Sequence, residues 1–373
     1  MALRSLMHRR ALPWLAAQPA LAILLYSCGS KPPSPTSVAV QPLSTATAPS
    51  AQPAQPSPVS NPAPVATDPL CGRPITDTSL LNRHPLAVKI DNITEARPQS
   101  GLAEACTVYE HLTEWDITRF TAIYYVENPE TLGPIRSARL VDISLAAEYD
   151  GLLAHAGGSE PVRARIKASG LKDLDQFNLS PSDTTYYRIK SRPSPFNLYT
   201  STALLRSLAG RRGWGEAKPQ PARTFLTPNE RRVGSPADVV KIPFSKENTV
   251  EYRYDKDKGA YGRYVSGAPH NDAITGQQIF ATNVIVQYVK IIETDIVEDA
   301  NGSRSRDMQL VGEGKAQVFH DGQLYEARWS RPSPDKLTQF LGEDGKPLPL
   351  RPGNIWIALV PLDMQGQILP TAQ

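Results

Sequence analysis

The sequence has few of the patterns on which enzymatic chemistry usually depends. It contains no paired histidines at zinc-hydrolase spacing, no serine nucleophile elbow, no dinucleotide fingerprint and no closely spaced cysteine pair. Its six histidines are scattered singly, so a metal site would need ligands from distant positions, for instance Asp91, His111 and His155. We therefore expect no metal and no cofactor. The missing motifs also leave any enzymatic function without a recognisable reaction type.

The chain also lacks an excess of charge of one sign. The formal net charge is +3, but Arg4, Arg9 and Arg10 lie in a segment that we expect to be removed, which leaves a neutral mature protein. A neutral protein has no overall field that attracts a polyanion. No basic run is longer than an arginine pair, and aromatic residues are not interleaved with basic ones. The sequence therefore predicts no binding of nucleic acid.

Residues 1–28 have the organisation of an export signal. A basic start is followed by an uncharged apolar run over 11–26, which is short for a membrane-spanning helix. The run ends in Leu25-Tyr26-Ser27-Cys28, which resembles the lipobox of bacterial lipoproteins, although Tyr26 stands where a small residue is usual. The resemblance implies a lipidated Cys28 and an extracytoplasmic protein anchored in the membrane. An ordinary signal peptide or an uncleaved anchor is the alternative.

Residues 29–70 form a segment rich in Pro, Ser and Ala. Eleven prolines lie between Pro32 and Pro69, and Lys31 is the only charged residue before Asp68. Such a segment cannot bury enough apolar surface to offset the entropy of ordering. The sequence therefore predicts a disordered, polyproline-leaning linker between the anchor and the folded part.

Residues 71–222 alternate predicted strands with predicted helices, which is typical of an α/β (α+β) domain with a layered sheet. Ser137 is expected to cap the first helix, which would place Arg136 and Arg139 on one side of its first turn. Strands are predicted over 86–90, 107–114, 119–127 and 152–156, and helices over 137–148, 160–169 and 202–211.

Residues 223–373 change from helix caps to hairpin turns. Asp257-Lys258-Gly259 and His320-Asp321-Gly322-Gln323 each separate two runs with strand character, and a further strand is predicted over 355–360. Short strands joined by such turns predict a β-rich carboxy-terminal domain, barrel-like or sandwich-like.

Charged side chains gather at the predicted strand ends and in the loops beside them. The strand ends present Asp91, Glu110 and His155, with Asp91 or Glu110 a candidate base and His155 a candidate acid. A planar guanidinium binds phosphate or carboxylate through two hydrogen bonds, so the neighbouring arginines are candidate anion ligands. The candidate ligand-binding residues in these loops are Arg97, Arg119, Arg136, Ser137 and Arg139.

Three interpretations of this cluster stay open. The charges can form an internal ion-pair network, for example with Asp142 and Glu148, or they can bind an anion, or they can support acid/base catalysis. The loop Gly157-Gly158-Ser159 would add backbone donors for an anion, unless Glu160 already satisfies that helix start.

Two cysteines remain after Cys28 is assigned to lipid. Cys71 and Cys106 can form a disulfide in an exported protein, which would fix the end of the linker to the folded part. The alternative is two separate thiols, with Cys106 a small buried apolar residue beside a strand.

Several motifs resemble the YerB-type lipoproteins, a bacterial family without a defined activity. The most specific are Ala96-Arg97-Pro98-Gln99-Ser100-Gly101 and Gly133-Pro134-Ile135-Arg136-Ser137-Ala138-Arg139, followed by Asn197-Leu198-Tyr199. The resemblance implies an α/β domain, a β-rich domain and lipid anchoring, and it adds Asn197 to the ligand-binding candidates. Phe196 stands where a histidine is usual in the family.

These observations favour a cell-envelope binding or adaptor lipoprotein. Its partner would be an envelope protein or an anionic glycan or peptide, together with the membrane that holds the lipid. A hydrolase or transferase acting through Asp91, Glu110 and His155 is the alternative, and a solute-binding protein is a further one.

Overall fold

The computed structural model of the chain describes residues 65–245 and 248–372. The predicted export signal, the lipidation site at Cys28 and most of the predicted linker lie outside these residues. The last residues of that linker are folded, since Ala66–Thr67 form β1, which pairs with β2 (Pro74–Ile75), and Leu70 is fully buried.

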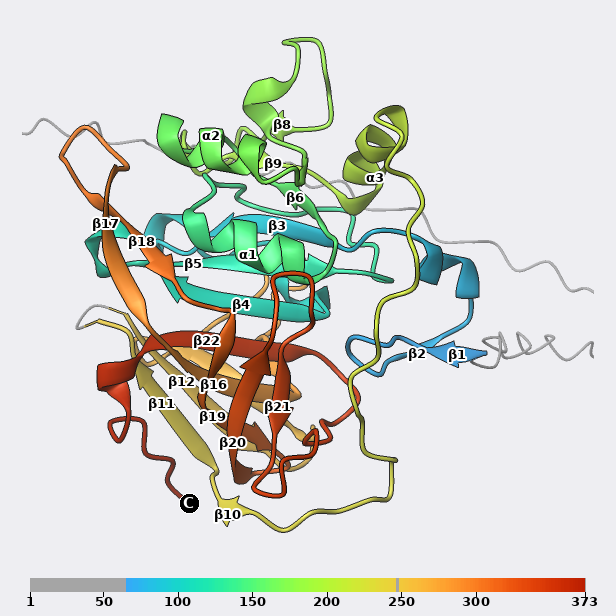
Figure 1. Cartoon of the computed structure of the whole chain (residues 1–373), viewed down its shortest axis with the longest axis vertical. Coiled ribbons are helices and arrows are strands. Elements are labelled where there is room, and N and C mark those ends of the chain that lie inside the picture. Colours follow the sequence, from blue (N-terminus) through green and yellow to red (C-terminus); the bar gives the residue numbers. More distant parts are fainter. Residues whose placement is uncertain (1–64, 246–247, 373) are drawn as a thin grey trace, which may run out of the picture. The chain divides into compact units, whose positions relative to one another are not determined.

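Eleven strands of the described chain form one mixed sheet (Figure 1). Strand β22 comes from the end of the chain but lies between β16 and β4, and it pairs in parallel with both. The sheet therefore joins strands from both predicted domains. Its order is β10 (Ser235–Pro236), β20 (Gln323–Arg331), β19 (Gly312–His320), β16 (Asn283–Val289), β22 (Ile355–Pro361), β4 (Thr107–Leu112), β5 (Thr118–Tyr124), β3 (Leu86–Asp91), β6 (Leu152–Ala154) and β7 (Lys172–Asp173), with β21 (Gln339–Leu341) paired to β20.

A second sheet and two short hairpins complete the strands of the described residues. None of these sheets closes into a barrel. Of the two forms predicted for the β-rich region, barrel-like and sandwich-like, the sandwich-like one therefore fits the structure. The second sheet contains β11 (Val239–Pro243), β12 (Thr249–Asp255), β13 (Ala260–Val265), β14 (Ala268–Pro269) and β15 (Phe280–Ala281). The hairpins are β17 (Ile291–Val297) with β18 (Arg304–Met308), and β8 (Tyr187–Arg188) with β9 (Leu198–Tyr199).

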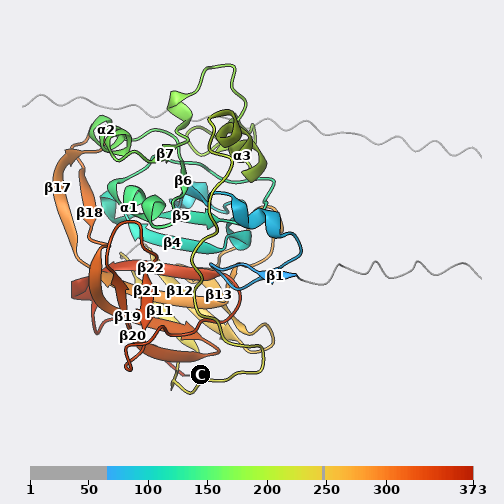
Figure 2. The same ribbon diagram turned by 45° about the vertical axis from the view of Figure 1, so that its right-hand side comes forward.

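The described residues contain three α-helices, which are α1 (Leu140–Glu148), α2 (Glu160–Ala168) and α3 (Thr202–Arg211). Ser201 caps α3 as its residue type suggests, because its hydroxyl accepts a hydrogen bond from the amide of Leu204 at 3.1 Å. Figure 2 shows the β17–β18 hairpin standing beside α1, with which β18 is in contact.

The central strands of the large sheet are covered on both faces. Side chains alternate along a strand, so Tyr109 and His111 of β4 face α1, whereas Glu110 faces the second sheet. On the second-sheet side, Trp356 of β22 packs edge-on against Tyr252 of β12, with ring centroids 6.5 Å apart. Burial on both faces explains why β3, β4 and β5 are continuous buried runs rather than alternating ones.

The predicted fold class is confirmed, with an α/β amino-terminal region followed by a β-rich region. The strongest predicted strands coincide with β3, β5 and β22, and the predicted hairpins around 257–259 and 320–323 join β12 to β13 and β19 to β20. At the second hairpin, Asp321 and Gly322 both have positive φ, which two-residue hairpin loops require.

Candidate functional site

The segment 133–139 is held by backbone hydrogen bonds to four neighbouring segments. The amide of Ile135 donates to Leu198 O at 2.8 Å, and the amide of Arg136 donates to Lys89 O at 3.0 Å. Gly133 has φ +153°, and a Cβ there would lie 2.7 Å from a ring carbon of Tyr199, so only glycine fits. The Gly133–Arg139 and Asn197–Tyr199 motifs therefore pack directly together.

Helix α1 begins later than the sequence suggests. Ser137 does not cap it; that prediction is wrong, because the residue preceding the helix is Arg139. The amide of Arg139 donates to the Asp142 carboxylate at 2.6 Å, so an acidic side chain in the first turn satisfies the helix start. Arg136 and Arg139 consequently lie in extended backbone before the helix, and their side chains reach different carboxylates.

Three arginines and three carboxylates form an alternating chain, which we call the arginine lattice. It consists of Arg136, Asp91, Arg119, Glu114, Arg139 and Glu298. Arg136 Nε lies 2.9 Å from Asp91 Oδ2, and Arg119 Nε lies 3.8 Å from the other oxygen of Asp91. Arg119 Nη2 donates to Glu114 Oε1 at 3.2 Å.

Glu114 is the centre of the lattice. It accepts two hydrogen bonds from the guanidinium of Arg139, one of them from Nε to Oε2 at 2.8 Å. Burial alone would raise the pKa of Glu114, but Arg139 and Arg119 outweigh it and lower the pKa to about 2. Arg139 Nε also lies 3.5 Å from Glu298 Oε2, just after β17. The three charges of each sign balance, so the internal-network interpretation accounts for Arg119, Arg136 and Arg139.

The partners in this network differ from those that the sequence suggested. Asp142 pairs with Lys89 of β3 at 2.9 Å rather than with an arginine of the turn. Glu148 lies 3.3 Å from Arg331 of β20, at the opposite end of α1.

The structure does not bring the three catalytic candidates together. Asp91 lies on the α1 face of the sheet, whereas Glu110 lies on the face covered by the second sheet, where Arg263 Nη2 donates to it at 2.6 Å. Both carboxylates are about 1% exposed. His155 Nε2 lies 2.9 Å from Asp173 Oδ1, and His155 Nδ1 lies 2.7 Å from Gly157 O. Each candidate is thus buried in its own set of contacts.

Sequence reasoning missed a buried polar cluster on β3 and β4. Lys89 Nζ lies 2.6 Å from His111 Nε2 and 2.9 Å from Asp142 Oδ1, and all three side chains are fully buried. Burial lowers the pKa of Lys89 to about 8, and burial and the lysine lower that of His111 to about 3, so the imidazole is neutral. Asp91, His111 and His155, the example of distant residues that a metal site would have needed, do not share partners, because His111 contacts Lys89 and His155 contacts Asp173.

The loop before α2 also binds an internal carboxylate. Asp175 Oδ1 accepts hydrogen bonds from the amides of Gly157 at 2.7 Å and Phe177 at 3.0 Å, and Arg163 Nε donates to Oδ2 at 3.0 Å. The sequence suggested Glu160 for this role, but Asp175 occupies it. The backbone amide of Gly157 is therefore already used by a carboxylate of the protein itself.

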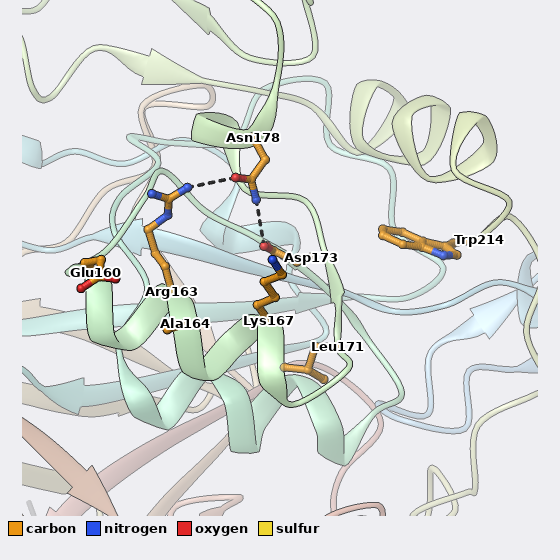
Figure 3. A pocket seen from close by; sticks show the side chains of 8 residues that line it. All are labelled: Glu160, Arg163, Ala164, Lys167, Leu171, Asp173, Asn178 and Trp214. Carbon is orange, nitrogen blue, oxygen red and sulfur yellow. Dashed lines mark hydrogen bonds between the residues drawn. The ribbon is translucent and has the colours of Figure 1, made fainter.

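The groove beside α2 has a volume of about 680 Å³. Figure 3 shows Glu160, Arg163 and Lys167 of α2 along one side and Trp214 across from them. Arg163 donates to Asn178 at 2.9 Å, and Asn178 donates to Asp173 at 3.2 Å. Acidic and basic side chains alternate around this groove, so it has no preference for one sign of charge.

Arg97, another of the predicted arginines, lines a pocket. Its Nε donates to Asn92 Oδ1 at 3.1 Å, and its Nη2 donates to Asn92 O at 2.7 Å and weakly to Asn248 Oδ1 at 3.4 Å. Within the described residues, its hydrogen-bond acceptors are thus all neutral oxygens. The pocket has a volume of about 210 Å³ and is also lined by Asn92, Ile93, Thr94, Trp115, Asp116, Ile117, Thr118, Ser245 and Asn248.

Trp115 stands at the rim of this pocket in an uncommon backbone conformation. Its φ is 61°, Asp116 follows with φ 55°, and the indole is 63% exposed. Two consecutive non-glycine residues in the left-handed region indicate local strain, which often accompanies a functional segment. The indole N–H donates to Asp299 at 2.9 Å, which fixes the ring against the end of the β17–β18 hairpin.

The remaining candidates have structural partners. Asn197 accepts a hydrogen bond from Arg188 Nη1 at 2.7 Å in the β8–β9 hairpin, and Phe196 beside it lies 5.9 Å from the guanidinium of Arg136. Cys71 and Cys106 are free thiols whose sulfur atoms lie within 4.8 Å of each other, and their disulfide stays a prediction.

No helix in the part of the chain that the structure describes is both long and apolar enough to span a membrane.

Comparison with known proteins places the chain in a family. Two family descriptions match it, "Protein of unknown function (DUF3048) N-terminal domain" over residues 70–215 and "Protein of unknown function (DUF3048) C-terminal domain" over residues 240–357. The chain is 29% identical to "Putative lipoprotein YerB" of Bacillus subtilis (strain 168) over 289 residues, which cover 77% of this chain and 84% of that protein.

A solved structure, "Crystal structure of YerB protein from Bacillus subtilis", matches with a TM-score of 0.70 and 30% identity, and the match covers 80% of this chain and 98% of that one. The resemblance inferred from the arginine motifs is therefore confirmed. Because the two DUF3048 matches together span more than half of its residues, this chain belongs to the YerB-type family.

Proposed function

We propose that this protein is a membrane-anchored lipoprotein of the cell envelope that binds an anionic group of an envelope component or a wall-synthesis partner in the pocket beside Arg97. The observation that supports the proposal most directly is the state of Arg97. It is a partly buried guanidinium whose described hydrogen-bond acceptors are neutral, and it faces an open pocket.

The distribution of charge favours Arg97 over the other arginines. In the lattice, the charge of Arg119, Arg136 and Arg139 is already balanced by carboxylates, so an external anion would have to displace one of them. Burial and the neighbouring Arg263 instead lower the pKa of Arg97, although Glu110, Asp91 and Glu95 act in the opposite direction, so these carboxylates compensate its positive charge only in part. An anion in the pocket would supply that compensation.

The chemistry of the lining favours a carboxylate attached to a larger molecule. A guanidinium makes paired hydrogen bonds to carboxylate, and the side-chain amide of Asn248, which gives one hydrogen bond to Thr118, has a second N–H beside it. The exposed ring of Trp115 offers a flat surface for a sugar ring or a peptide side chain. A volume of about 210 Å³ is below the roughly 300–1,000 Å³ of pockets that enclose a small molecule. An end group of a peptide or glycan fits this pocket better than a whole solute does.

The location in the envelope rests on two further observations. The sequence around Cys28 resembles a lipobox, and the similar Bacillus protein has the name of a lipoprotein. We infer that Cys28 carries the lipid and that the Pro-rich segment after it separates the folded part from the membrane.

Calorimetric titration of the full chain in detergent with soluble cell-wall fragments tests the proposal. We expect fragments with free carboxylates to bind and the same fragments with amidated carboxylates to bind at least about tenfold more weakly, because a hydrogen bond to a charged group contributes roughly 1.5–3 kcal/mol. Arg97→Ala should reduce affinity for the free carboxylates by a similar factor, and Arg97→Lys by less. Trp115→Ala should weaken binding of glycan-bearing fragments without changing stability.

Arg188→Ala is the matched control, because Arg188 is exposed, contacts Asn197 and is not among the residues that line the pocket. It should bind as the unaltered chain does. Equal affinity of the Arg97→Ala variant, with an unchanged melting temperature, would show that the anion does not bind at this pocket. Binding that is lost in Arg136→Ala but kept in Arg97→Ala would instead indicate that the anion binds at Arg136, the terminal arginine of the lattice.

A further inference from the structure

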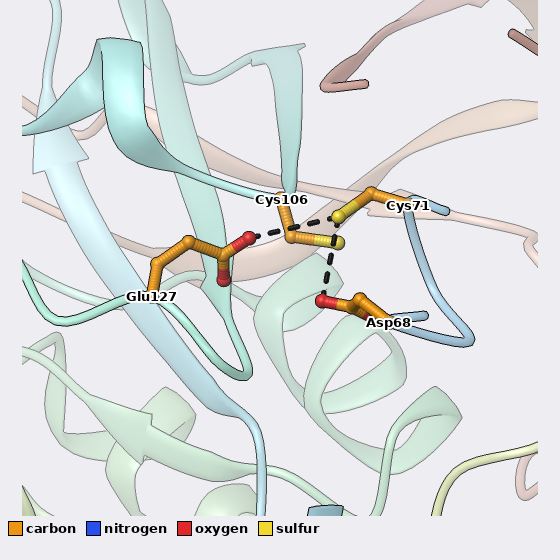
Figure 4. A group of neighbouring side chains, drawn as sticks. All are labelled: Asp68, Cys71, Cys106 and Glu127. Atoms are coloured by element: carbon orange, nitrogen blue, oxygen red, sulfur yellow. Dashed lines mark hydrogen bonds between the residues drawn. The ribbon is translucent and has the colours of Figure 1, made fainter. Parts of the chain in front are cut away.

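Two thiols and two carboxylates meet close to the first residues that the structure describes (Figure 4). Asp68 and Cys71 lie three residues apart in the turn between β1 and β2. Cys106 directly precedes β4, and Glu127 follows β5. One sulfur or oxygen atom from each of the four side chains lies within 4.8 Å of the others. Three separate parts of the sequence thus contribute to one cluster.

The cluster is buried and its turn is tightly fixed. Asp68, Cys71 and Cys106 are 0% exposed, and the side chain of Glu127 is 9% exposed. The amide of Gly72 donates to Asp68 O at 2.8 Å, and a Cβ on Gly72 would lie 2.8 Å from the ring of Phe225. The turn therefore holds Asp68 and Cys71 on the same side.

Each carboxylate is oriented by a backbone amide. Leu70 N donates to Asp68 Oδ1 at 2.7 Å, which leaves Oδ2 toward the thiol of Cys71 at 3.4 Å. Tyr125 N donates to Glu127 Oε2 at 3.0 Å, which leaves Oε1 toward the same thiol at 3.6 Å. Hydrogen bonds of this kind orient the ligands of metal ions in proteins, and the geometry is already present here.

The cluster has more negative than positive charge. Arg73 is the one cation of the described residues that bonds to it, with Nη1 3.1 Å from Glu127 Oε1, and it faces two carboxylates and two ionisable thiols. All four side chains are acids, and a buried carboxylate or thiolate is unfavourable unless a cation compensates its charge. A divalent ion would supply that compensation.

We propose that Asp68, Cys71, Cys106 and Glu127 form a binding site for a divalent, thiol-preferring metal ion, for which Zn²⁺ is the best match. Two sulfur and two oxygen ligands from separate turns fit the four-coordinate geometry that Zn²⁺ adopts. On binding, each thiol loses its proton to solvent and each sulfur forms a bond to the metal, so one Zn²⁺ releases two protons from the cysteines. No change of oxidation state is involved.

The role of such a site is structural. All four ligand positions belong to the protein, which leaves no position for substrate or water. The metal would join the β1–β2 turn, at the end of the predicted linker, to β4 and to the segment after β5 in the large sheet. This inference is independent of the pocket beside Arg97, because it uses other residues and other measurements.

The test is metal binding by the full chain, purified in detergent under reducing conditions and freed of metal with a chelator. Titration with Co²⁺ should give a saturable thiolate-to-cobalt charge-transfer band at one ion per chain, and Zn²⁺ should displace the Co²⁺ and raise the melting temperature. Elemental analysis of chain prepared without chelator should find zinc. Cys106→Ser should lose the band, and Asp68→Asn should weaken binding at least tenfold.

Cys28→Ser is the control for the third cysteine: it also removes the proposed lipid, but it leaves the four ligands in place, so it should bind Co²⁺ as the unaltered chain does. The Co²⁺ titration of the unaltered chain tests the proposal even if the variants fold poorly. No charge-transfer band from the reduced unaltered chain would overturn the proposal. So would a Cys71–Cys106 disulfide in the isolated protein that, once reduced, leaves a chain without affinity for Co²⁺.

Discussion

The variant Glu114→Gln removes the central carboxylate of the arginine lattice and changes little else in shape. It leaves Arg119 and Arg139, which are 4% and 7% exposed, buried next to each other without the acid that separates them. A buried ion pair that loses one partner is strongly destabilised because the remaining charge stays desolvated. We therefore expect a large loss of stability at neutral pH.

The size of this loss follows from the pKa of Glu114. A shift from the ordinary 4.5 to about 2 corresponds to about 3 kcal/mol of stabilisation by the ionised carboxylate. Breaking a buried pair typically costs about 3–5 kcal/mol. The two routes agree, so about 3 kcal/mol is the expected decrease in the free energy of unfolding at pH 7.

The pH dependence has a definite sign. The folded-state pKa of Glu114 is depressed, so its contribution is complete above the unfolded value near 4.5 and is lost as the pH falls through about 2. By pH 3 about 2 kcal/mol should already be gone. The Glu114→Gln variant has no such carboxylate, so the difference between the two proteins should shrink as the pH falls.

Urea denaturation of both proteins at pH 7, 5 and 3, followed by circular dichroism, measures these quantities. Glu160→Gln is the control, because Glu160 is an exposed carboxylate at the start of α2 and should change stability by less than about 0.5 kcal/mol. A decrease below about 1 kcal/mol in Glu114→Gln, equal at all three pH values, would refute the closed lattice. Arg119 and Arg139 would then be available for an external anion.

Two further predictions concern the loops around the lattice. Gly133→Ala should destabilise the protein by more than about 2 kcal/mol in urea denaturation, because its φ is +153° and a Cβ would lie 3.0 Å from Leu198 O, whereas Gly276→Ala, with open space around it, should cost less. Burial disfavours the protonated form of His155, but Asp173 and Asp175 outweigh it and raise its pKa. The unaltered protein should therefore lose stability as the pH rises above about 6.5 through that raised value, and His155→Asn should lack this decline; equal slopes in both proteins would contradict it.

Local sequence patterns predicted most elements of the fold but not how they combine. The run over 355–360 is apolar enough to indicate a buried strand, and β22 confirms it. Its partners β16 and β4 are distant in sequence, and nothing in the run specifies parallel pairing with them. Register between distant strands is set by packing over the whole sheet, so the single sheet shared by both regions could not be inferred.

The candidate site was also predicted only in part: the residue types indicated a charged cluster, but the partner of each residue could not be inferred. The arginine motifs correctly indicated a charged cluster, but the sequence placed Glu114 at the end of a predicted strand, where it carried no functional signal. It reaches Arg139 because the chain turns back at Trp115 and Asp116, both with positive φ that neither residue type suggests. The start of α1 was misplaced for a related reason, since Ser137 has the favoured type for a cap but Asp142 performs the role.

The positions of the strand ends explain why Arg97 hydrogen-bonds to neutral oxygens whereas Arg119, Arg136 and Arg139 pair with carboxylates. Asp91 and Glu114 lie on the α1 face, where Arg119, Arg136 and Arg139 also point, so opposite charges on that face pair with each other. Arg97 lies beyond the end of β3, beside Asn92, whose side-chain amide donates to Glu110 on the other face at 3.1 Å. The amide thus separates the guanidinium from the nearest buried carboxylate, which is itself bound to Arg263. If Asn92→Asp places a carboxylate beside Arg97, binding of anionic fragments by the folded protein should fall by at least tenfold, because the internal acid then does what the external one did. Stability should fall as well, because the variant loses the amide's hydrogen bonds to Glu110 and Thr118 and brings two buried carboxylates together.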